Sequence, residues 1–378
     1  MSSTFYLPCE KYLEIKEKYE SLYGQSYYGV EKKFFEWMYL KHPYHHLLLP
    51  NNQFTSFCFS KDSTITACIN FVVTKIYITG KEHITCSSVS SFSTPQNSTH
   101  YSLLLKQLSD QFDFYLSFGP TEAIEKLYVE KLKFQSMPTV PRSVAILDEK
   151  QLIPLLQKNP LPLLPCNAVQ IKKWAEESRT HILNATYFRL KDSSQLIPKY
   201  WEEHLKNSQA TMDKSPEIIK WRYFSHPIIQ YHIISTTPEQ ASGLAIIRIE
   251  QSRGLAQYPF ARLVEFIPTS GNEEVLAQSV LAFCAEKECV FIDFFCGSNQ
   301  MLSRLPLVFK SFETHSHLEI PRLLAPIEWR KKKSITSLLK INRKKNDPNI
   351  LNFNNLYFTK GEADQDVLVN SNHITPNL

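Results

Sequence analysis

Two carboxylates in apolar, strand-like stretches are the residues best suited to acid–base chemistry. Glu265 lies in "RLVEFIP" and Asp293 lies in "FIDFFCG". A carboxylate flanked by phenylalanines loses solvation, which raises its pKa toward the range in which a general base works near neutral pH. Such a base could deprotonate an amine directly or through one water molecule. Each acid also has a structural alternative, in which it is ion-paired or faces solvent from an alternating strand.

Other motifs of catalysis and metal binding are weaker. None of the eight cysteines forms a C-x-x-C pair, and the spacing of Cys284, Cys289 and Cys296 fits no common zinc pattern. The sequence contains no G-x-S-x-G motif of a serine nucleophile. Asp364 and Asp366 form a D-x-D pair, but the strand-and-helix context that would support a metal or nucleotide-sugar site is missing. We therefore expect no metal.

A heptapeptide, W-x-Y-x-x-H-P, occurs twice in the chain. One copy begins at Trp37 and the other at Trp221. Each copy ends a helical pattern, because proline cannot continue a helix and pushes the preceding residue toward an extended conformation. The helix that carries Trp221 opens with an N-cap, Ser215, and a proline at the first helical position. We expect both tryptophans to be buried at equivalent positions, where a large ring anchors a helix to a sheet.

The same order of elements follows both heptapeptides. In the first half, strands are predicted over 53–60, 63–80 and 83–93, then a helix over 99–111 and a strand over 112–119. In the second half, strands are predicted over 230–236, 242–253 and 260–269, then a helix over 272–288 and a strand over 290–297. The predicted fold is therefore α/β with mixed sheets, built from two lobes that arose by duplication of one domain.

The repeat also sets the predicted domain limits. Residues 1–150 form an N-terminal lobe, 151–184 a proline-rich connector, 185–330 a C-terminal lobe, and 331–378 a basic and then polar tail. Between Arg330 and Lys345 the chain has eight Lys or Arg residues and no acid. We interpret this cluster as a solvated segment or as an anion site.

Composition limits the classes of protein to which the chain can belong. The chain has 378 residues, of which 43% are hydrophobic and 12% aromatic, as expected for a globular protein with two cores. A net charge of +5 does not by itself indicate a nucleic-acid partner. No apolar run is long enough to span a bilayer, and the first residues lack the basic and apolar blocks of a signal peptide. We expect a cytoplasmic protein that has no membrane partner.

The order of elements, together with "SPEIIKWRYFSHPIIQYHII" and "FTKGEADQDV", resembles the GNAT acyl-CoA N-acyltransferases. The similarity is to tandem-lobe GNAT-like proteins of bacterial surface-polysaccharide and sugar-modification clusters, and it covers about residues 5 to 367. The resemblance implies an N-acyltransferase that transfers an acyl group, such as acetyl, from acyl-CoA to an amino sugar or another small amine. It also implies substrate contacts from Trp221, Arg222, Asp364 and Asp366.

The same resemblance assigns chemical roles. Transfer from thioester to amine is direct, without an enzyme-bound intermediate. Glu265 or Asp293 takes the proton from the amine, and a tyrosine such as Tyr223 or Tyr357 protonates the leaving thiolate. These roles are expectations carried by the family resemblance.

The family binds the pantetheine and pyrophosphate of acyl-CoA at a bulged fourth strand and at the loop before the next helix. In the first half this loop is "QNSTHY", so the resemblance assigns cofactor binding to Gln96, Ser98 and Thr99. In the second half it is "TSGNEEV", which offers Gly271 and Asn272 but places two glutamates where they would repel a pyrophosphate. The usual glycines are missing from both loops, and the whole chain has only nine glycines, against roughly 26 at average usage.

These departures predict an asymmetric pair of lobes. The N-terminal lobe keeps a neutral loop that holds CoA more easily, whereas the C-terminal lobe keeps more acids and is expected to bind the acceptor and move the proton. Two alternatives remain open. One is a binding or scaffold protein that has the fold without catalysis, and the other is an aminoacyl-tRNA-dependent transferase in which the basic tail holds RNA.

Overall fold

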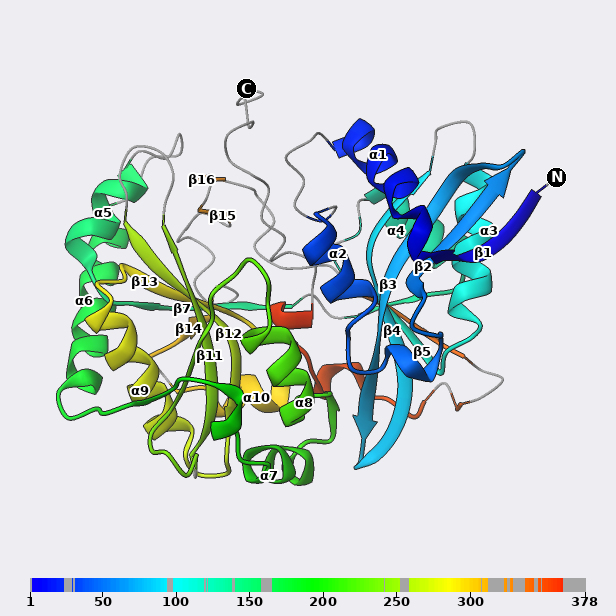
Figure 1. Ribbon diagram of the computed structural model, residues 1–378. Coiled ribbons are helices and arrows are strands. Elements are labelled where there is room, and N and C mark those ends of the chain that lie inside the picture. The colour runs from blue at the N-terminus through cyan, green and yellow to red at the C-terminus, as the bar shows by residue number, and fades with distance from the viewer. Residues whose placement is uncertain are drawn as a thin grey trace.

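The computed structural model describes residues 2–23, 29, 31–93, 98–118, 120, 122–137, 140–157, 165–240, 242–251, 258–306, 308–311, 323–324, 327–328, 337–342, 346–347 and 349–362. Two large mixed sheets, each flanked by helices, form two lobes that lie side by side (Figure 1). The sequence prediction of an α/β protein with two lobes is confirmed.

Counted over the described residues, the first sheet has nine strands and the second has seven. The first runs in the order β1 (Ser2–Pro8), β2 (Gln53–Lys61), β3 (Thr64–Ile78), β4 (Lys81–Ser93), β5 (Phe114–Phe118), β17 (Ser337–Ile341) and β6 (Gln135–Ser136), and β3 also pairs with β9 (Ala210–Met212), which pairs with β18 (Leu356–Tyr357). The second runs in the order β8 (Phe188–Leu190), β10 (His232–Ser235), β11 (Gly243–Gln251), β12 (Pro259–Pro268), β13 (Phe291–Phe295), β7 (Arg142–Ile146) and β14 (Lys310–Ser311). A separate hairpin joins β15 (Leu323–Leu324) to β16 (Ile327–Glu328).

Strand pairing crosses the predicted domain limits. β7 lies within the range assigned to the N-terminal lobe, yet it pairs antiparallel with β13 of the second sheet. β17 lies within the range assigned to the tail, yet it pairs antiparallel with β5 of the first sheet. The two orders, β1-β2-β3-β4-β5-β17-β6 and β8-β10-β11-β12-β13-β7-β14, therefore correspond strand for strand with one strand exchanged between the lobes. Such an exchange makes each lobe depend on the other half of the chain.

The helices cover both faces of each sheet. In the first lobe these are α1 (Tyr12–Tyr23), α2 (Lys32–Tyr39), α3 (Ser98–Ser109) and α4 (Glu122–Lys126). Asn70 of β3 bonds Tyr19 of α1, whereas Phe59 of β2 stacks on His100 of α3. Side chains along a strand alternate between the two faces of the sheet, so α1 and α3 lie on opposite faces. The other helices are α5 (Glu149–Gln157), α6 (Pro165–Ile182), α7 (Lys199–Asn207), α8 (Pro216–Ile219), α9 (Glu273–Glu286) and α10 (Asn299–Arg304). The predicted connector thus contains α6 and most of α5.

The two heptapeptides meet each other between the lobes. Trp37 Nε1 donates to the carbonyl oxygen of Trp221 at 3.1 Å, and Trp221 Nε1 donates to the carbonyl oxygen of Trp37 at 3.1 Å. The two indole rings stack with centroids 5.0 Å apart, and both tryptophans are buried. A reciprocal contact of this kind, residue i to j and j to i, is the geometry of a two-fold interface. The repeat therefore joins the lobes.

The tyrosine of each heptapeptide has an equivalent task. Tyr39 at the end of α2 has its hydroxyl 3.2 Å from Ser90 Oγ on β4. Tyr223, in the π-helical turn Lys220–Phe224 that continues α8, donates to Glu265 Oε1 on β12 at 2.6 Å. Each tyrosine therefore ties its helix to the strand that, in both lobes, carries a β-bulge.

Acid pH is expected to destabilise the fold, because several histidines are buried in the neutral form. Burial, together with the charges of Lys214 and Arg304, lowers the pKa of His204 to about 3, and burial lowers the pKa of His42 well below its usual value. Below about pH 6.5 the unfolded chain binds protons that the folded chain does not accept, so each such histidine costs about 1.4 kcal/mol per pH unit.

Urea unfolding between about pH 7.5 and pH 5.5 measures this loss. We expect the free energy of unfolding to fall toward acid pH, and His204→Gln to reduce that slope, because glutamine does not titrate. A slope that stays the same in the variant would contradict the assignment to His204.

Candidate functional site

Both lobes have a bulge at the same place in the sheet. The register of β3 and β4 shifts between Asn70 and Phe71, which leaves Val89 of β4 as the extra residue. The register of β11 and β12 shifts between Ile246 and Ile247, which leaves Val264 of β12 as the extra residue. A bulge bends its strand and ends regular pairing.

Beyond each bulge the sheet opens. β4 pairs in parallel with β5 only from Thr85 to Ser88, although β4 continues to Ser93. β12 pairs in parallel with β13 only from Ala261 to Leu263, although β12 continues to Pro268. Each lobe therefore has a splayed edge between its fourth and fifth strands, where the backbone of the bulged strand leaves the ladder.

In the first lobe this opening is a cavity of about 510 Å³, which we call the first-lobe cavity. Its walls are the end of β4, the first turns of α3, and apolar residues of α1 and the α4 region: Leu22, Ser91, Phe92, Ser93, Ser98, Thr99, Tyr101, Ser102, Ile124 and Leu127. Ser98 and Thr99, two of the predicted cofactor ligands, open α3, whose first turn has no acidic residue. Gln96, the third, lies outside the described residues. A helix N-terminus without acids favours an anion.

In the second lobe the chain itself fills the equivalent opening. Tyr357 of β18 places its hydroxyl 3.2 Å from the backbone nitrogen of Phe266 and 3.0 Å from its carbonyl oxygen. Phe358 follows, and its carbonyl oxygen accepts from the N–H of Gly297 at 2.9 Å. At Gly297 a side chain would collide with the ring of Phe358. The backbone N–H and carbonyl oxygen of Phe266, two residues beyond the Val264 bulge, are therefore already bonded to the protein.

The predicted cofactor residues of the second lobe, Gly271 and Asn272, lie in the turn before α9. Asn272 Nδ2 donates to Thr269 Oγ1 at 3.0 Å. The two glutamates expected to repel a pyrophosphate are engaged elsewhere: Glu273 Oε1 accepts from Arg304 Nε at 2.6 Å, and Glu274 lies 2.7 Å from His181 Nδ1. This helix N-terminus thus carries two acids in its first turn, unlike that of α3.

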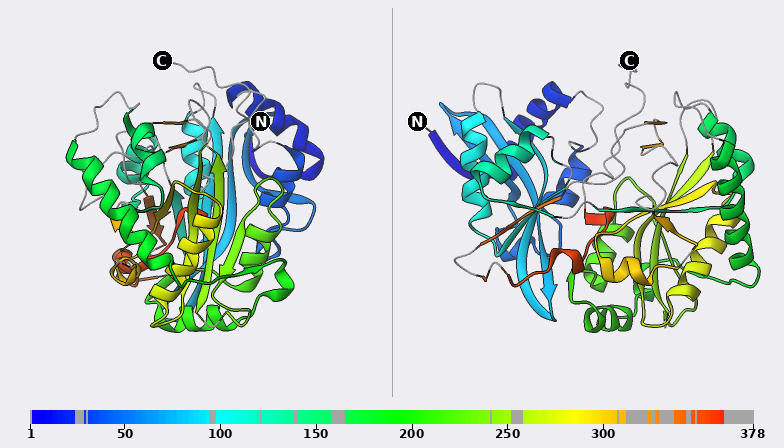
Figure 2. Two further views of the ribbon diagram at one scale, coloured as in Figure 1. Left: turned by 90° about the vertical axis from the view of Figure 1, so that its left-hand side faces the viewer. Right: turned by 180° about the vertical axis from the view of Figure 1, so that it is seen from behind.

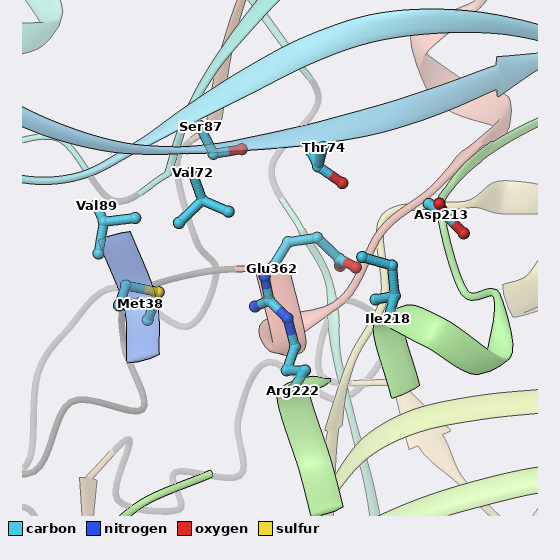
Figure 3. A pocket seen from close by; sticks show the side chains of 9 residues that line it. All are labelled: Met38, Val72, Thr74, Ser87, Val89, Asp213, Ile218, Arg222 and Glu362. Carbon is cyan, nitrogen blue, oxygen red and sulfur yellow. The ribbon is translucent and has the colours of Figure 1, made fainter. Parts of the chain in front are cut away.

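A second, small cavity of about 30 Å³ lies where the lobes meet, and we call it the inter-lobe cavity (Figure 3). The first lobe contributes Met38, Val72, Thr74, Ser87 and Val89, and the second half of the chain contributes Asp213, Ile218, Arg222 and Glu362. Val89, the bulge residue, lines this cavity, and Ser91, two residues further on, lines the first-lobe cavity. A separation of two residues along a strand is about 7 Å. The two cavities are therefore neighbours along one short stretch of β4.

A cluster of buried charged and phenolic groups supports the inter-lobe cavity. Lys214 Nζ contacts Glu265 Oε1 at 2.6 Å and also contacts Glu362 Oε1. Tyr223 donates to Glu265 Oε1 at 2.6 Å, and the Tyr357 hydroxyl lies 3.2 Å from Glu265 Oε2. Burial lowers the pKa of Lys214, although the Glu265 carboxylate opposes this. Burial, followed by the Glu265 charge, raises the pKa of Tyr223 well above its usual value.

Two of the three predicted catalytic residues, Glu265 and Tyr223, are therefore brought together. Neither is among the residues that line the inter-lobe cavity, and both are buried. Glu265 and Tyr223 lie behind the cavity lining, where they support Lys214 and Glu362, and are themselves little exposed to a substrate. Arg222, a predicted substrate contact, does line the cavity, whereas Trp221 is engaged in the tryptophan pair.

The third predicted catalytic residue, Asp293, lies in a separate ion network. Arg142 donates to Asp293 Oδ1 from Nε at 3.0 Å and to Oδ2 from Nη2 at 2.9 Å, and Arg262 Nη1 donates to Oδ2 at 3.2 Å. Asp293 is buried and lines neither the first-lobe cavity nor the inter-lobe cavity. Asp293 is thus the ion-paired acid that was expected from the sequence as the structural alternative. An acid on a strand of an apolar sheet needs a cation. Asp364 and Asp366 lie outside the described residues.

Sequence reasoning missed Asp213, Lys214 and Glu362. The first two follow β9, a three-residue strand of the first sheet, and Glu362 ends the turn η9 (Lys360–Glu362), which lies between the lobes (Figures 1 and 2). A signal for them existed in the sequence: Asp213-Lys214 stands directly before the N-cap Ser215, and Glu362 opens the acidic stretch that also contains Asp364. Polar residues in such stretches usually face solvent, so their burial could not be predicted.

Solved structures with the same architecture include a GCN5-related N-acetyltransferase from Kribbella flavida, with a TM-score of 0.55 at 9% sequence identity over 90% of this chain and 71% of that one. A probable N-acyltransferase of unknown function from Enterococcus faecalis V583 has a TM-score of 0.52 at 10% identity, over 90% and 72%. The N-myristoyltransferase of Saccharomyces cerevisiae with bound myristoyl-CoA and inhibitors has a TM-score of 0.50 at 10% identity, over 90% and 80%. The chain has the GNAT fold.

At this level of identity the likeness establishes the GNAT fold alone. No protein-family model matches the sequence, and no curated protein is significantly similar to it. Within the described part of the chain, no group of three or more His, Cys, Asp or Glu residues could hold a metal ion. No helix among the described residues is both long enough and apolar enough to cross a membrane.

Proposed function

We propose that the protein is an acyl-CoA-dependent N-acyltransferase whose donor binds in the first-lobe cavity. The observation that carries this proposal is the difference between the two splayed edges. The first-lobe edge opens into a cavity of about 510 Å³ beside a helix N-terminus without acids, whereas the second-lobe edge is bonded to Tyr357. The pantetheine arm lies along Ser91 to Ser93, and the pyrophosphate lies at Ser98 and Thr99.

The amino nitrogen of the acceptor meets the thioester carbonyl at the inter-lobe cavity, whose volume of about 30 Å³ has room for the reacting groups alone. Val89 separates the two cavities, so an acyl group that passes the bulge reaches Thr74, Ser87 and the charged groups of the second half. The acceptor class, an amino sugar or other small amine of surface-polysaccharide biosynthesis, rests on the resemblance of the "WRYFSHP" and "GEADQD" stretches. In this proposal the first lobe binds the donor and the second supplies most of the proton transfer, which is the asymmetry expected from the sequence.

Calorimetric titration with acetyl-CoA and longer acyl-CoAs tests the proposal. We expect one site per chain, together with a rise in the thermal midpoint that grows with ligand concentration. Dephospho-CoA and free pantetheine, titrated in parallel, separate the contributions of the phosphates and the arm. Absence of binding by any acyl-CoA at millimolar concentration would overturn the proposal in favour of a scaffold protein, and salt-sensitive retention of tRNA would favour an aminoacyl-tRNA-dependent transferase.

A further inference from the structure

Two carboxylates line the inter-lobe cavity among the described residues, Asp213 and Glu362, and their surroundings differ. Asp213 Oδ1 accepts from the N–H of Ser215 at 2.7 Å, and its Oδ2 accepts from the hydroxyl of Tyr44. Asp213 follows β9 and is fixed by the first sheet, since its N–H donates to the carbonyl oxygen of Lys75 at 3.0 Å. Its contacts are those of a structural acid that fixes the turn before α8.

Glu362 lies in the middle of the cavity lining, between Arg222 and the first-lobe strands (Figure 3). Its Oε1 contacts Lys214 Nζ, and its Oε2 accepts from the N–H of Thr359 at 2.6 Å and from the Thr359 hydroxyl at 3.3 Å. The side chain of Glu362 is 8% exposed, whereas that of Glu265, the other partner of Lys214, is fully buried. A carboxylate has about four acceptor positions, so Glu362 can accept a further proton donor from the cavity.

The backbone holds Glu362 in this place. Gly361 lies against the Tyr223 hydroxyl and Glu265 Oε1, where a side chain would collide with both. Its carbonyl oxygen accepts from Arg222 Nη1. The turn η9 is therefore clamped to the second lobe while the Glu362 side chain reaches the wall formed by the first lobe.

We propose that Glu362 is the general base of the acyl transfer and that Lys214 positions it. This inference rests on the proposed function. An uncharged acceptor amine attacks the thioester carbonyl carbon, so a C–N bond forms and the C–S bond breaks. One N–H proton passes to a carboxylate oxygen of Glu362, and the resulting acid returns that proton to the departing thiolate sulfur. The products are the amide and free CoA, and Glu362 is a carboxylate again.

The test compares Glu362→Gln with Asp213→Asn, a matched loss of one negative charge in the same cavity. Release of the CoA thiol is followed with acetyl-CoA and a panel of primary amines that includes glucosamine, and acetyl-CoA binding is measured by calorimetry. We expect Glu362→Gln to lower kcat roughly 100- to 10,000-fold and to remove the acid limb of the kcat/KM pH profile. Its acetyl-CoA Kd stays within about twofold of the wild type, because the first-lobe cavity is intact.

Lys214 still pairs with Glu265 in Glu362→Gln, so the variant is expected to fold. Lys214→Met supplies the second readout: a positioning role predicts a lower kcat at unchanged acetyl-CoA affinity, with a shifted acid limb. The proposal is overturned if Glu362→Gln retains a third or more of the wild-type kcat, or if Asp213→Asn loses more than Glu362→Gln does. A wild-type chain that binds no acyl-CoA overturns the proposed function instead, and this inference with it.

Discussion

Thr99→Glu is expected to weaken acetyl-CoA binding by roughly 5- to 1000-fold. The residue lies in the first turn of α3 and lines the first-lobe cavity, so the new carboxylate faces the pyrophosphate. Two like charges about 4 Å apart repel by about 1 to 4 kcal/mol, depending on exposure. Thr99 is exposed, and an acid at a helix N-terminus stabilises the helix. The loss is therefore in binding and not in folding, which calorimetry and thermal unfolding separate.

The matched control is the equivalent helix of the other lobe. The double variant Glu273→Gln, Glu274→Gln removes two negative charges from the N-terminus of α9. In the wild type, Glu273 pairs with Arg304 and Glu274 with His181. Since Tyr357 fills the neighbouring cleft, we expect the acetyl-CoA Kd to change less than twofold. Tighter binding in this double variant, with no effect of Thr99→Glu, would place the donor in the second lobe.

Asp293→Ala is expected to destabilise the protein by about 3 to 5 kcal/mol, because it leaves two buried guanidinium groups without their shared partner. Asp293, Arg142 and Arg262 are all buried within the second sheet. Glu250 Oε1 still accepts from Arg262 Nε at 2.8 Å, so Arg262 keeps one ionic partner in the variant. Urea unfolding measures the change in the free energy of unfolding.

A double variant distinguishes a structural role from a catalytic one. Asp293→Leu combined with Arg142→Met replaces the ion pair by apolar side chains, and we expect it to recover much of the lost stability. The recovered protein should bind acetyl-CoA and transfer the acyl group. If Asp293→Asn is as stable as the wild type and yet loses more than about 100-fold in kcat, Asp293 takes part in proton transfer, as its sequence context first suggested.

Local patterns predicted the elements of the two repeats, because each is encoded in its own residues. The strands predicted over 53–60 and 83–93 are β2 (Gln53–Lys61) and β4 (Lys81–Ser93), and the helix predicted over 272–288 is α9 (Glu273–Glu286). The exchange of β7 and β17 could not be predicted. Each of these strands has only five residues, and nothing in its sequence selects β5 or β13 as its partner. The path of the chain between the lobes decides which sheet it joins.

The candidate site was only partly predictable for the same reason. Glu265 was found because alternation and flanking apolar residues mark it as a buried acid, and Tyr223 because it belongs to the repeat. The cation that accompanies Glu265 is Lys214, 51 residues away in the chain, and the partner of Asp293 is Arg142, 151 residues away. Spacing in the sequence carries no information about such pairs, so an acid held by a cation and an acid facing a cavity look alike.

The exchanged strands also set the order in which a nascent chain can fold. β7 has left the ribosome before β13 and β14 appear, so the second sheet can be completed as soon as β14 is made. β5 must wait for β17, whose Lys340 bonds Ser109 from 231 residues further along. At roughly 5 to 20 residues per second that wait lasts about 10 to 45 seconds, during which β5 offers an unpaired edge that invites aggregation. The second sheet is therefore completed before the first, which reverses the usual N-terminal-first order of folding during synthesis.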